Sequence, residues 1–237
     1  MTSALPVTAR LAWWGTAWLR GQVSPDDLLD AVLDGDVTHL VAGDPLLTAL
    51  AELRSAGATG FGAAYPREGA PVGLGGPADF NTAAIEEGEA VVAVGAERGW
   101  VPRRVGPTVE WSAYPAARRQ VPDVGEADRE LRGTLLTATA ELADLDVARW
   151  RPEVADELMD LRHRRVPAAP PGVPARCAEL AARGLQALGI ADLALADDGG
   201  ALSASMAEQR RAAIAPLDLA GRRALVAACS PEAWPSG

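Results

Sequence analysis

The residue types that carry out acid–base and nucleophilic catalysis are scarce in this sequence. His39 and His163 are the only histidines, and neither lies in a G-x-S-x-G or an H-E-x-x-H motif. All 22 basic residues are arginine, which excludes a Schiff-base lysine and a P-loop lysine. We therefore predict no catalytic residue and no cofactor. His39 lies in an apolar run and is predicted to be a half-buried histidine with its polar partners satisfied.

A metal site is not predicted either. The segment 26–30 (DDLLD) has a carboxylate spacing that can bridge Mg²⁺ to a diphosphate. Ser24 and Pro25 precede it, so these acids fall in the first turn of a helix, where they interact favourably with free backbone N–H groups. We interpret them as residues of a helix start. Cys177 and Cys229 fit no metal-ligand spacing and are predicted to be buried thiols.

An anionic small molecule is the ligand predicted for the region around residues 66–77 and 111–118. The loop 66–77 (PREGAPVGLGGP) lies between a predicted strand and a predicted helix, and exposed N–H groups in such loops can bind anions. In this interpretation arginines hold the ligand and aromatic rings stack on it; the set is Arg67, Gly75, Gly76, Trp111, Tyr114, Arg118 and Arg119. The alternative is a plain surface loop with both aromatic side chains in the core.

Tryptophan is enriched, with seven residues beside two Phe and two Tyr. Trp13, Trp14 and Trp18 lie in one predicted helix over residues 8–20. If Trp14 and Trp18 face the core, Trp13 points about 100° away and is exposed. An exposed Trp is a good anchor for a partner protein or a second copy of the chain. The alternative is that Trp13 packs under a neighbouring helix.

The net charge of −10 makes nucleic acid the least favoured partner. The most basic segment, 162–165 (RHRR), is interpreted as a helix C-terminus. A helix–break–helix at Pro216 carries Arg210, Arg211, Arg222 and Arg223 and faintly resembles a helix-turn-helix. No basic leader precedes an apolar stretch, and the run 11–19 is too short to span a bilayer. We expect a cytoplasmic protein with no membrane partner, from a GC-rich bacterial genome.

The elements that would position these residues indicate an α+β fold. Predicted strands are 38–42, 59–65, 89–94, 100–104 and 108–114. Predicted helices are 8–20, 25–34, 44–55, 79–87, a long one after Pro122, one from Pro152, 175–188, 203–215 and 217–229. We expect a mixed α/β domain over residues 1–121 with about five strands. The helical part, residues 122–237, either packs on the sheet or forms a separate domain.

These observations favour a non-catalytic interaction, assembly or regulatory module that self-associates or binds a protein partner. The alternative is a protein or enzyme that binds an anionic small molecule in a pocket between the sheet and the C-terminal helices.

Overall fold

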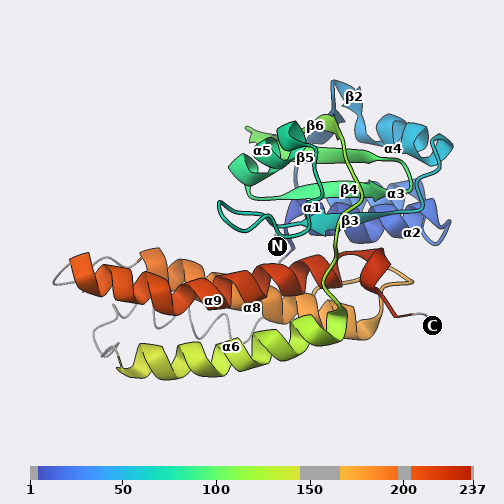
Figure 1. Cartoon of the computed structure of the whole chain (residues 1–237). Helices are drawn as coiled ribbons and strands as arrows, with labels where there is room; N and C mark the ends of the chain where they lie inside the picture. The colour runs from blue at the N-terminus through green and yellow to red at the C-terminus, as the bar shows by residue number, and fades with distance from the viewer. Residues whose placement is uncertain (1–4, 145–165, 197–203, 236–237) are drawn as a thin grey trace.

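The computed structural model describes residues 5–144, 166–196 and 204–235 and has an α+β fold (Figure 1). A six-stranded sheet has the order β2-β1-β6-β5-β4-β3, one strand more than expected. All neighbouring strands are antiparallel except β1 and β6, which are parallel. The strands are β1 (Thr38–Val41), β2 (Asp44–Pro45), β3 (Gly60–Ala64), β4 (Ala90–Val94), β5 (Arg98–Val105) and β6 (Thr108–Pro115).

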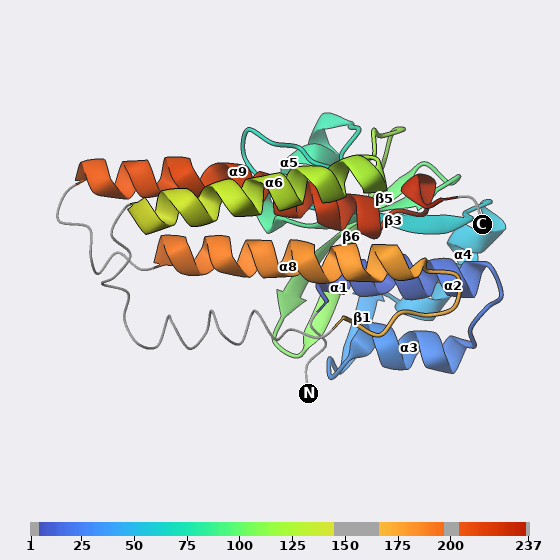
Figure 2. The same cartoon turned by 90° about the horizontal axis from the view of Figure 1, so that it is seen from below.

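Helices cover both faces of the sheet. The N-terminal segment α1 (Val7–Arg10), η1 (Leu11–Gly15) and α2 (Thr16–Leu19) lies between the sheet and the C-terminal helices (Figures 1 and 2). Its side chains share one core with α3 (Pro25–Leu33) and α4 (Leu46–Ser55). On the opposite face, α5 (Ala78–Glu87) buries Phe80 against Tyr114 and Val101.

Three long helices make up the described residues of the C-terminal part. They are α6 (Val124–Asp144), α8 (Ala175–Ala196) and α9 (Ala204–Ala228), followed by the short η4 (Pro231–Ala233). Figure 2 shows the three helices side by side beneath the sheet. Small residues bring α8 and α9 close together, because a Cβ on Gly184 would lie 3.1 Å from the carbonyl oxygen of Gly221. None of the described helices combines the length and the apolarity that crossing a bilayer requires.

The predicted break at Pro216 is wrong, because α9 continues through it. A proline inside a helix costs about 3 kcal/mol through its missing N–H and its clash with the preceding turn. Ile214 and Leu217, on either side, are fully buried against the rest of the molecule, so packing outweighs that cost. The helix-turn-helix resemblance therefore has no counterpart in the structure. The predicted helix from Pro152 and the segment 162–165 lie outside the described residues.

Of the two interpretations of Trp13, exposure is wrong, and the alternative, in which it packs under another helix, is the one that the structure shows. Residues 11–15 form a π-helical turn inside the N-terminal helix, and a π turn holds more residues than an α turn. The constant 100° rotation used to place the three tryptophans therefore fails at Trp13, which is completely buried. Its indole Nε1 donates to the carbonyl oxygen of Ala228 at 3.1 Å. Trp18 is buried as expected, and Trp14 is only partly buried.

The outer edge of β3 is closed by parts of the chain that are distant in sequence. The N–H of Phe61 donates to Thr16 Oγ1 at 2.9 Å, and the N–H of Ala63 donates to the carbonyl oxygen of Cys229 at 2.9 Å. The carbonyl oxygen of Ala63 accepts from Arg119 at 2.7 Å. An edge strand with unpaired backbone groups can pair with other chains, and these bonds remove that opportunity.

Candidate functional site

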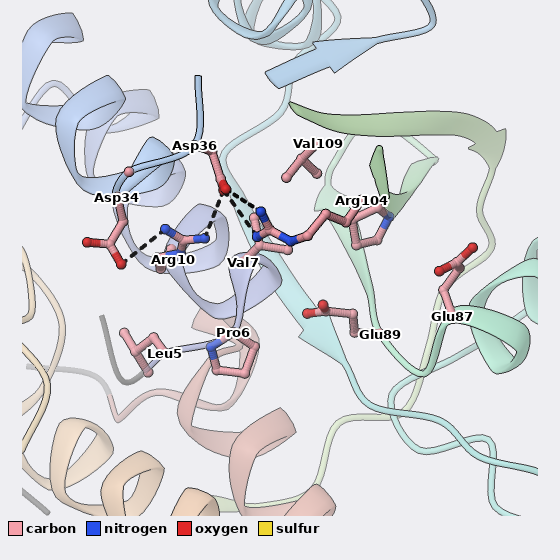
Figure 3. Close-up of a pocket in the computed structure, with 12 residues that line it drawn as sticks. Leu5, Pro6, Val7, Arg10, Asp34, Asp36, Glu87, Glu89, Arg104 and Val109 are labelled. Carbon is pink, nitrogen blue, oxygen red and sulfur yellow. Dashed lines mark hydrogen bonds and ion pairs between the residues drawn. The ribbon is translucent and has the colours of Figure 1, made fainter. Parts of the chain in front are cut away.

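A cavity of about 520 Å³ opens between the start of α1, the α3–β1 turn and the strands β4, β5 and β6 (Figure 3). Its charged side chains are Arg10, Arg104, Asp34, Asp36, Glu87 and Glu89, and its apolar wall is formed by Leu5, Pro6, Val7, Pro102 and Val109. This volume falls in the range of about 300–1,000 Å³ that small-molecule pockets occupy. We call it the Arg10–Glu89 cavity.

Asp36 is the centre of the charge network. Its carboxylate accepts two hydrogen bonds from Arg104, one from His39 Nε2 at 3.1 Å and one from Arg10 at 3.5 Å. Burial raises the pKa of Asp36, but the hydrogen bonds and charges of Arg104 and His39 outweigh it. The pKa therefore lies below its ordinary value, and Asp36 is ionised at neutral pH.

His39 is completely buried beside Trp111 and has a defined proton position. The indole Nε1 of Trp111 only donates, and it faces His39 Nδ1 at 3.4 Å. The proton of the neutral imidazole is therefore on Nε2, where it is donated to Asp36. Burial lowers the pKa of His39, and Asp36 compensates only in part. His39 is thus buried with both nitrogens satisfied, as its apolar surroundings in the sequence indicated.

Glu89 lies directly before β4 and lines the cavity, and its carboxylate accepts hydrogen bonds at the N-terminus of α1. Its Oε2 accepts from Thr8 Oγ1 at 2.6 Å and from the Thr8 N–H at 3.4 Å. Tyr65 lies 3.1 Å from the same hydroxyl, and because Thr8 has one proton to donate, the Tyr65 phenol donates to Thr8. Burial raises the pKa of Glu89, and the bonds from Thr8 and the charges of Arg10 and Arg104 offset this only in part.

Arg10 is the most buried cation of the cavity, with 6% of its surface exposed. One of its amino groups donates to the carbonyl oxygen of Leu33 at 3.1 Å and faces Asp34 at 3.3 Å; the other faces Asp36 at 3.5 Å. Its Nε has no hydrogen-bond partner among the described residues. This Nε is itself buried, so it is an unsatisfied donor of the core and not one that the cavity presents to a ligand.

The sequence-predicted anion site is assembled in part, but its central arginine is already saturated. Arg119 uses all five N–H donors: Nη1 on the carbonyl oxygens of Ala63 and Gly73, Nη2 on Ser230 and Glu232, and Nε on Glu232. These bonds measure 2.7–3.1 Å. We call these side chains and carbonyls the Arg119 cluster; it joins the loop before α5, β3 and the C-terminus.

Gly75 lies against the same region for a packing reason. A Cβ there would lie 2.5 Å from the carbonyl oxygen of Arg118, so the glycine permits close backbone contact. Gly76 precedes a cis proline in the same loop, and Arg118 is exposed. A second cavity of about 490 Å³ is lined by Arg118, Arg119, Glu97 and Glu232 together with residues of β4. Arg119 has no donor left to offer there.

The other predicted ligand residues lie apart. Arg67 forms an ion pair with Asp218 of α9 at 2.8 Å. Trp111 is buried in the core beside Trp100, and Tyr114 packs on Phe80 at the other face of the sheet. Of the predicted set, the structure therefore brings together only Gly75, Gly76, Arg118 and Arg119.

The arginines considered for nucleic acid are paired with acids where the structure describes their side chains. Arg222 binds Asp218 at 3.0 Å, Arg223 binds Glu130 at 2.8 Å, and Arg211 binds Glu208. Large apolar side chains that are exposed in the described part of the chain come from separate elements: Val37, Val105, Leu136, Val166 and Leu195. Within the described ranges, no group of three or more metal-ligating side chains is arranged to hold an ion.

The sequence analysis missed the residues that form the Arg10–Glu89 cavity. Glu89 was included in a predicted strand, and Arg10 was treated as the flank of an apolar run. One signal was available: each is a charge directly before an apolar segment, Glu89 before the Val-rich segment 90–94 and Arg10 before Leu11. Such charges need a buried partner, but the sequence does not show which one.

The chain matches two family models along most of its length. Residues 8–125 match the N-terminal domain of the Rv1486c-like protein, and residues 125–226 match its C-terminal domain. Neither the curated proteins nor the solved structures contain a match to this chain.

Proposed function

We propose that this chain, which belongs to the Rv1486c-like protein family, binds a small polar molecule in the Arg10–Glu89 cavity. The observation that carries the proposal is a cavity of about 520 Å³ whose lining combines six charged side chains with an apolar wall. Cavities that bind small molecules have this combination of apolar walls and a few fixed polar groups.

The position of Glu89 supports the same site. Its Oε1 has no hydrogen-bond partner among the described residues, while Oε2 is held by Thr8. The cavity therefore offers one unused acceptor, which Thr8 holds in place through the other carboxylate oxygen. Burial raises the pKa of Glu89, and perturbed carboxyl groups in cavities are enriched at functional sites.

The proposal is tested by native mass spectrometry of the full chain purified gently from its own host. We expect a stoichiometric small-molecule mass on the wild-type protein that is lost from the Glu89→Gln variant. Gln keeps an acceptor for Thr8, so the variant is expected to fold. Glu86→Gln, on the exposed side of α5, is the matched control and retains the mass. A wild-type protein without any bound mass, and without NMR shift changes at Thr8, Arg10 and Glu89 in a fragment screen, refutes the proposal.

Protein interaction through α6 is a second candidate function. Leu136 on this helix is 76% exposed and is the side chain that a partner would cover. Self-association through this face predicts a dimer that Leu136→Glu converts to a monomer, measured by light scattering during size-exclusion chromatography. Both cysteines are free and buried, which supports the reducing cytoplasm as the location.

A further inference from the structure

We propose that the Arg10–Glu89 cavity binds a neutral molecule with two adjacent hydroxyl groups, as in a sugar ring. One hydroxyl donates to Glu89, and the oxygen of the other accepts a hydrogen bond from Arg104. This inference rests on the proposed function and names the chemical class of the ligand.

The first argument is an acceptor on Glu89 that a ligand can reach. Thr8 holds Oε2, whereas Oε1 has no hydrogen-bond partner among the described residues. Within the described ranges, the unpartnered side-chain atoms that are closed off from solvent are the Nε atoms of three arginines: Arg10, Arg183 and Arg223. Oε1 of Glu89 is not among them, so this oxygen is accessible from the cavity.

The second argument is a set of free donors on Arg104. A guanidinium group has five N–H donors, and Arg104 uses two of them on the carboxylate of Asp36. The remaining donors have no partner among the described residues, and the side chain is 57% exposed. A ligand oxygen can therefore bind Arg104 while the ion pair with Asp36 stays in place.

The third argument is that the acceptor and the donors lie apart across the cavity. Arg104 pairs with Asp36 and forms no ion pair with Glu89. The two side chains nevertheless sense each other, because the charge of Arg104 lowers the pKa of Glu89 and the charge of Glu89 raises the pKa of Arg104. Figure 3 shows Glu89 between Pro6 and Arg104. A molecule that donates with one group and accepts with the next bridges this gap.

The fourth argument favours a neutral ligand. A cation beside Glu89 would also face Arg10 and Arg104, whose positive charges already act on this carboxylate. An anion beside Arg104 would also face the ionised Asp36 and Glu89. Hydroxyl groups meet both sites without adding charge, and the apolar wall of the cavity suits the C–H face of a sugar ring.

Hydroxyl groups also fit Glu89 better than the N–H of an amide does. Burial raises the pKa of Glu89, so its protonated form is more accessible than for a solvated carboxyl group. A hydroxyl donates to the carboxylate and accepts from the protonated carboxyl group, whereas an amide N–H only donates. A diol therefore keeps its hydrogen bond to Glu89 in both protonation states.

Methyl β-D-ribofuranoside is the probe, because it carries a single pair of adjacent hydroxyls, and its matched analogue is the deoxy sugar that lacks one of them. Binding to the full chain is measured by NMR titration of the isotope-labelled protein. We expect the riboside to bind at least about tenfold more tightly, because the deoxy sugar leaves Glu89 or Arg104 without its hydrogen bond. D-Glucose should also bind more tightly than D-glucosamine or D-glucuronate, which add a charge to the same ring.

Two variants locate the diol. Arg104→Lys keeps a cation for Asp36 but loses the guanidinium donors, and Glu89→Gln places an N–H donor where Oε1 is. Each should abolish the tenfold preference for the riboside. Arg103→Lys is the matched control for the first, because Arg103 is an exposed neighbour on β5 that does not line the cavity, and Glu86→Gln is the control for the second. Both controls should retain the preference.

Three results overturn the inference. Equal affinity for the riboside and the deoxy sugar shows that adjacent hydroxyls are not recognised. Tighter binding of glucosamine or glucuronate than of glucose shows that the site takes a charged ligand. A riboside preference that persists in both Arg104→Lys and Glu89→Gln places the diol elsewhere. If no sugar binds at millimolar concentration, the diol class is rejected, and the native mass measurement decides separately whether the cavity binds any small molecule.

Discussion

Replacing Arg119 with alanine should destabilise the whole chain, although this residue lies outside the Arg10–Glu89 cavity. Its side chain is 2% exposed and provides five hydrogen bonds. Ala63 and Gly73 belong to the sheet and the adjoining loop, whereas Ser230 and Glu232 follow α9. The substitution therefore removes one of the main polar links between the two parts of the molecule.

The magnitude follows from what the substitution leaves behind. Removing one partner of a buried ion pair costs about 3–5 kcal/mol, because the other charge and the acceptors stay buried without donors. Glu232 is 28% exposed and can be partly hydrated, so we expect the lower end of that range. For a chain of this length, about 3 kcal/mol corresponds to a fall of about 6–12 °C in Tm.

The assay is urea unfolding followed by tryptophan fluorescence and by far-UV circular dichroism. Arg118→Ala is the matched control, because Arg118 is the exposed neighbour on the same loop, and it should change the free energy of unfolding by less than about 0.5 kcal/mol. If Arg119→Ala is within about 0.5 kcal/mol of Arg118→Ala, the Arg119 cluster does not contribute to stability and the reasoning is refuted.

Four further predictions use other parts of the structure. Gly75→Ala should cost about 1–3 kcal/mol, because its Cβ would meet the backbone of Arg118, while Gly133→Ala, with open space around it, should not destabilise; thermal unfolding compares them. Trp13→Phe should cost more than Trp14→Phe in urea unfolding, because Trp13 is completely buried and its indole N–H donates to Ala228, whereas Trp14 is only partly buried; equal costs would contradict this role. Pro216→Ala should stabilise α9 by about 1–3 kcal/mol in chemical denaturation, and a loss of stability would show that the proline is favourable there. The pKa of His39 is lowered in the folded chain, so below pH 6.5 the unfolded chain binds more protons and stability should fall as the pH falls; His39→Asn should flatten this slope.

Much of the local structure was predictable because its causes lie close together in the sequence. Ser24 and Asp27 form the reciprocal capping box at the start of α3 that their spacing indicated. The alternation Thr108–Tyr114 gives a strand with one buried and one wetter face, because successive side chains point to opposite sides. The change from strand-like to helical periodicity after Pro122 corresponds to the start of α6 at Val124.

The parts that escaped prediction depend on contacts between distant segments. The π turn at 11–15 is stabilised by a fold in which Trp13 reaches Ala228, and nothing local distinguishes it from an α turn. The proline in α9 is tolerated because the residues beside it pack in the core. Helix propensities of single residues do not include such packing. The cavity joins Arg10, Asp36 and Glu89, three single charges from separate elements. Their types were visible in the sequence, but their proximity is a property of the sheet order.

The closure of β3 has a consequence for how the chain is made. Its Ala63 N–H is satisfied by Cys229, which is synthesised 166 residues after Ala63. At about 5–20 residues per second, about 8–33 s separate the appearance of these two residues. During that interval a nascent chain carries an open strand edge, to which a neighbouring nascent chain on the same polysome can add a strand. We therefore expect the yield of this protein to depend on the rate of translation.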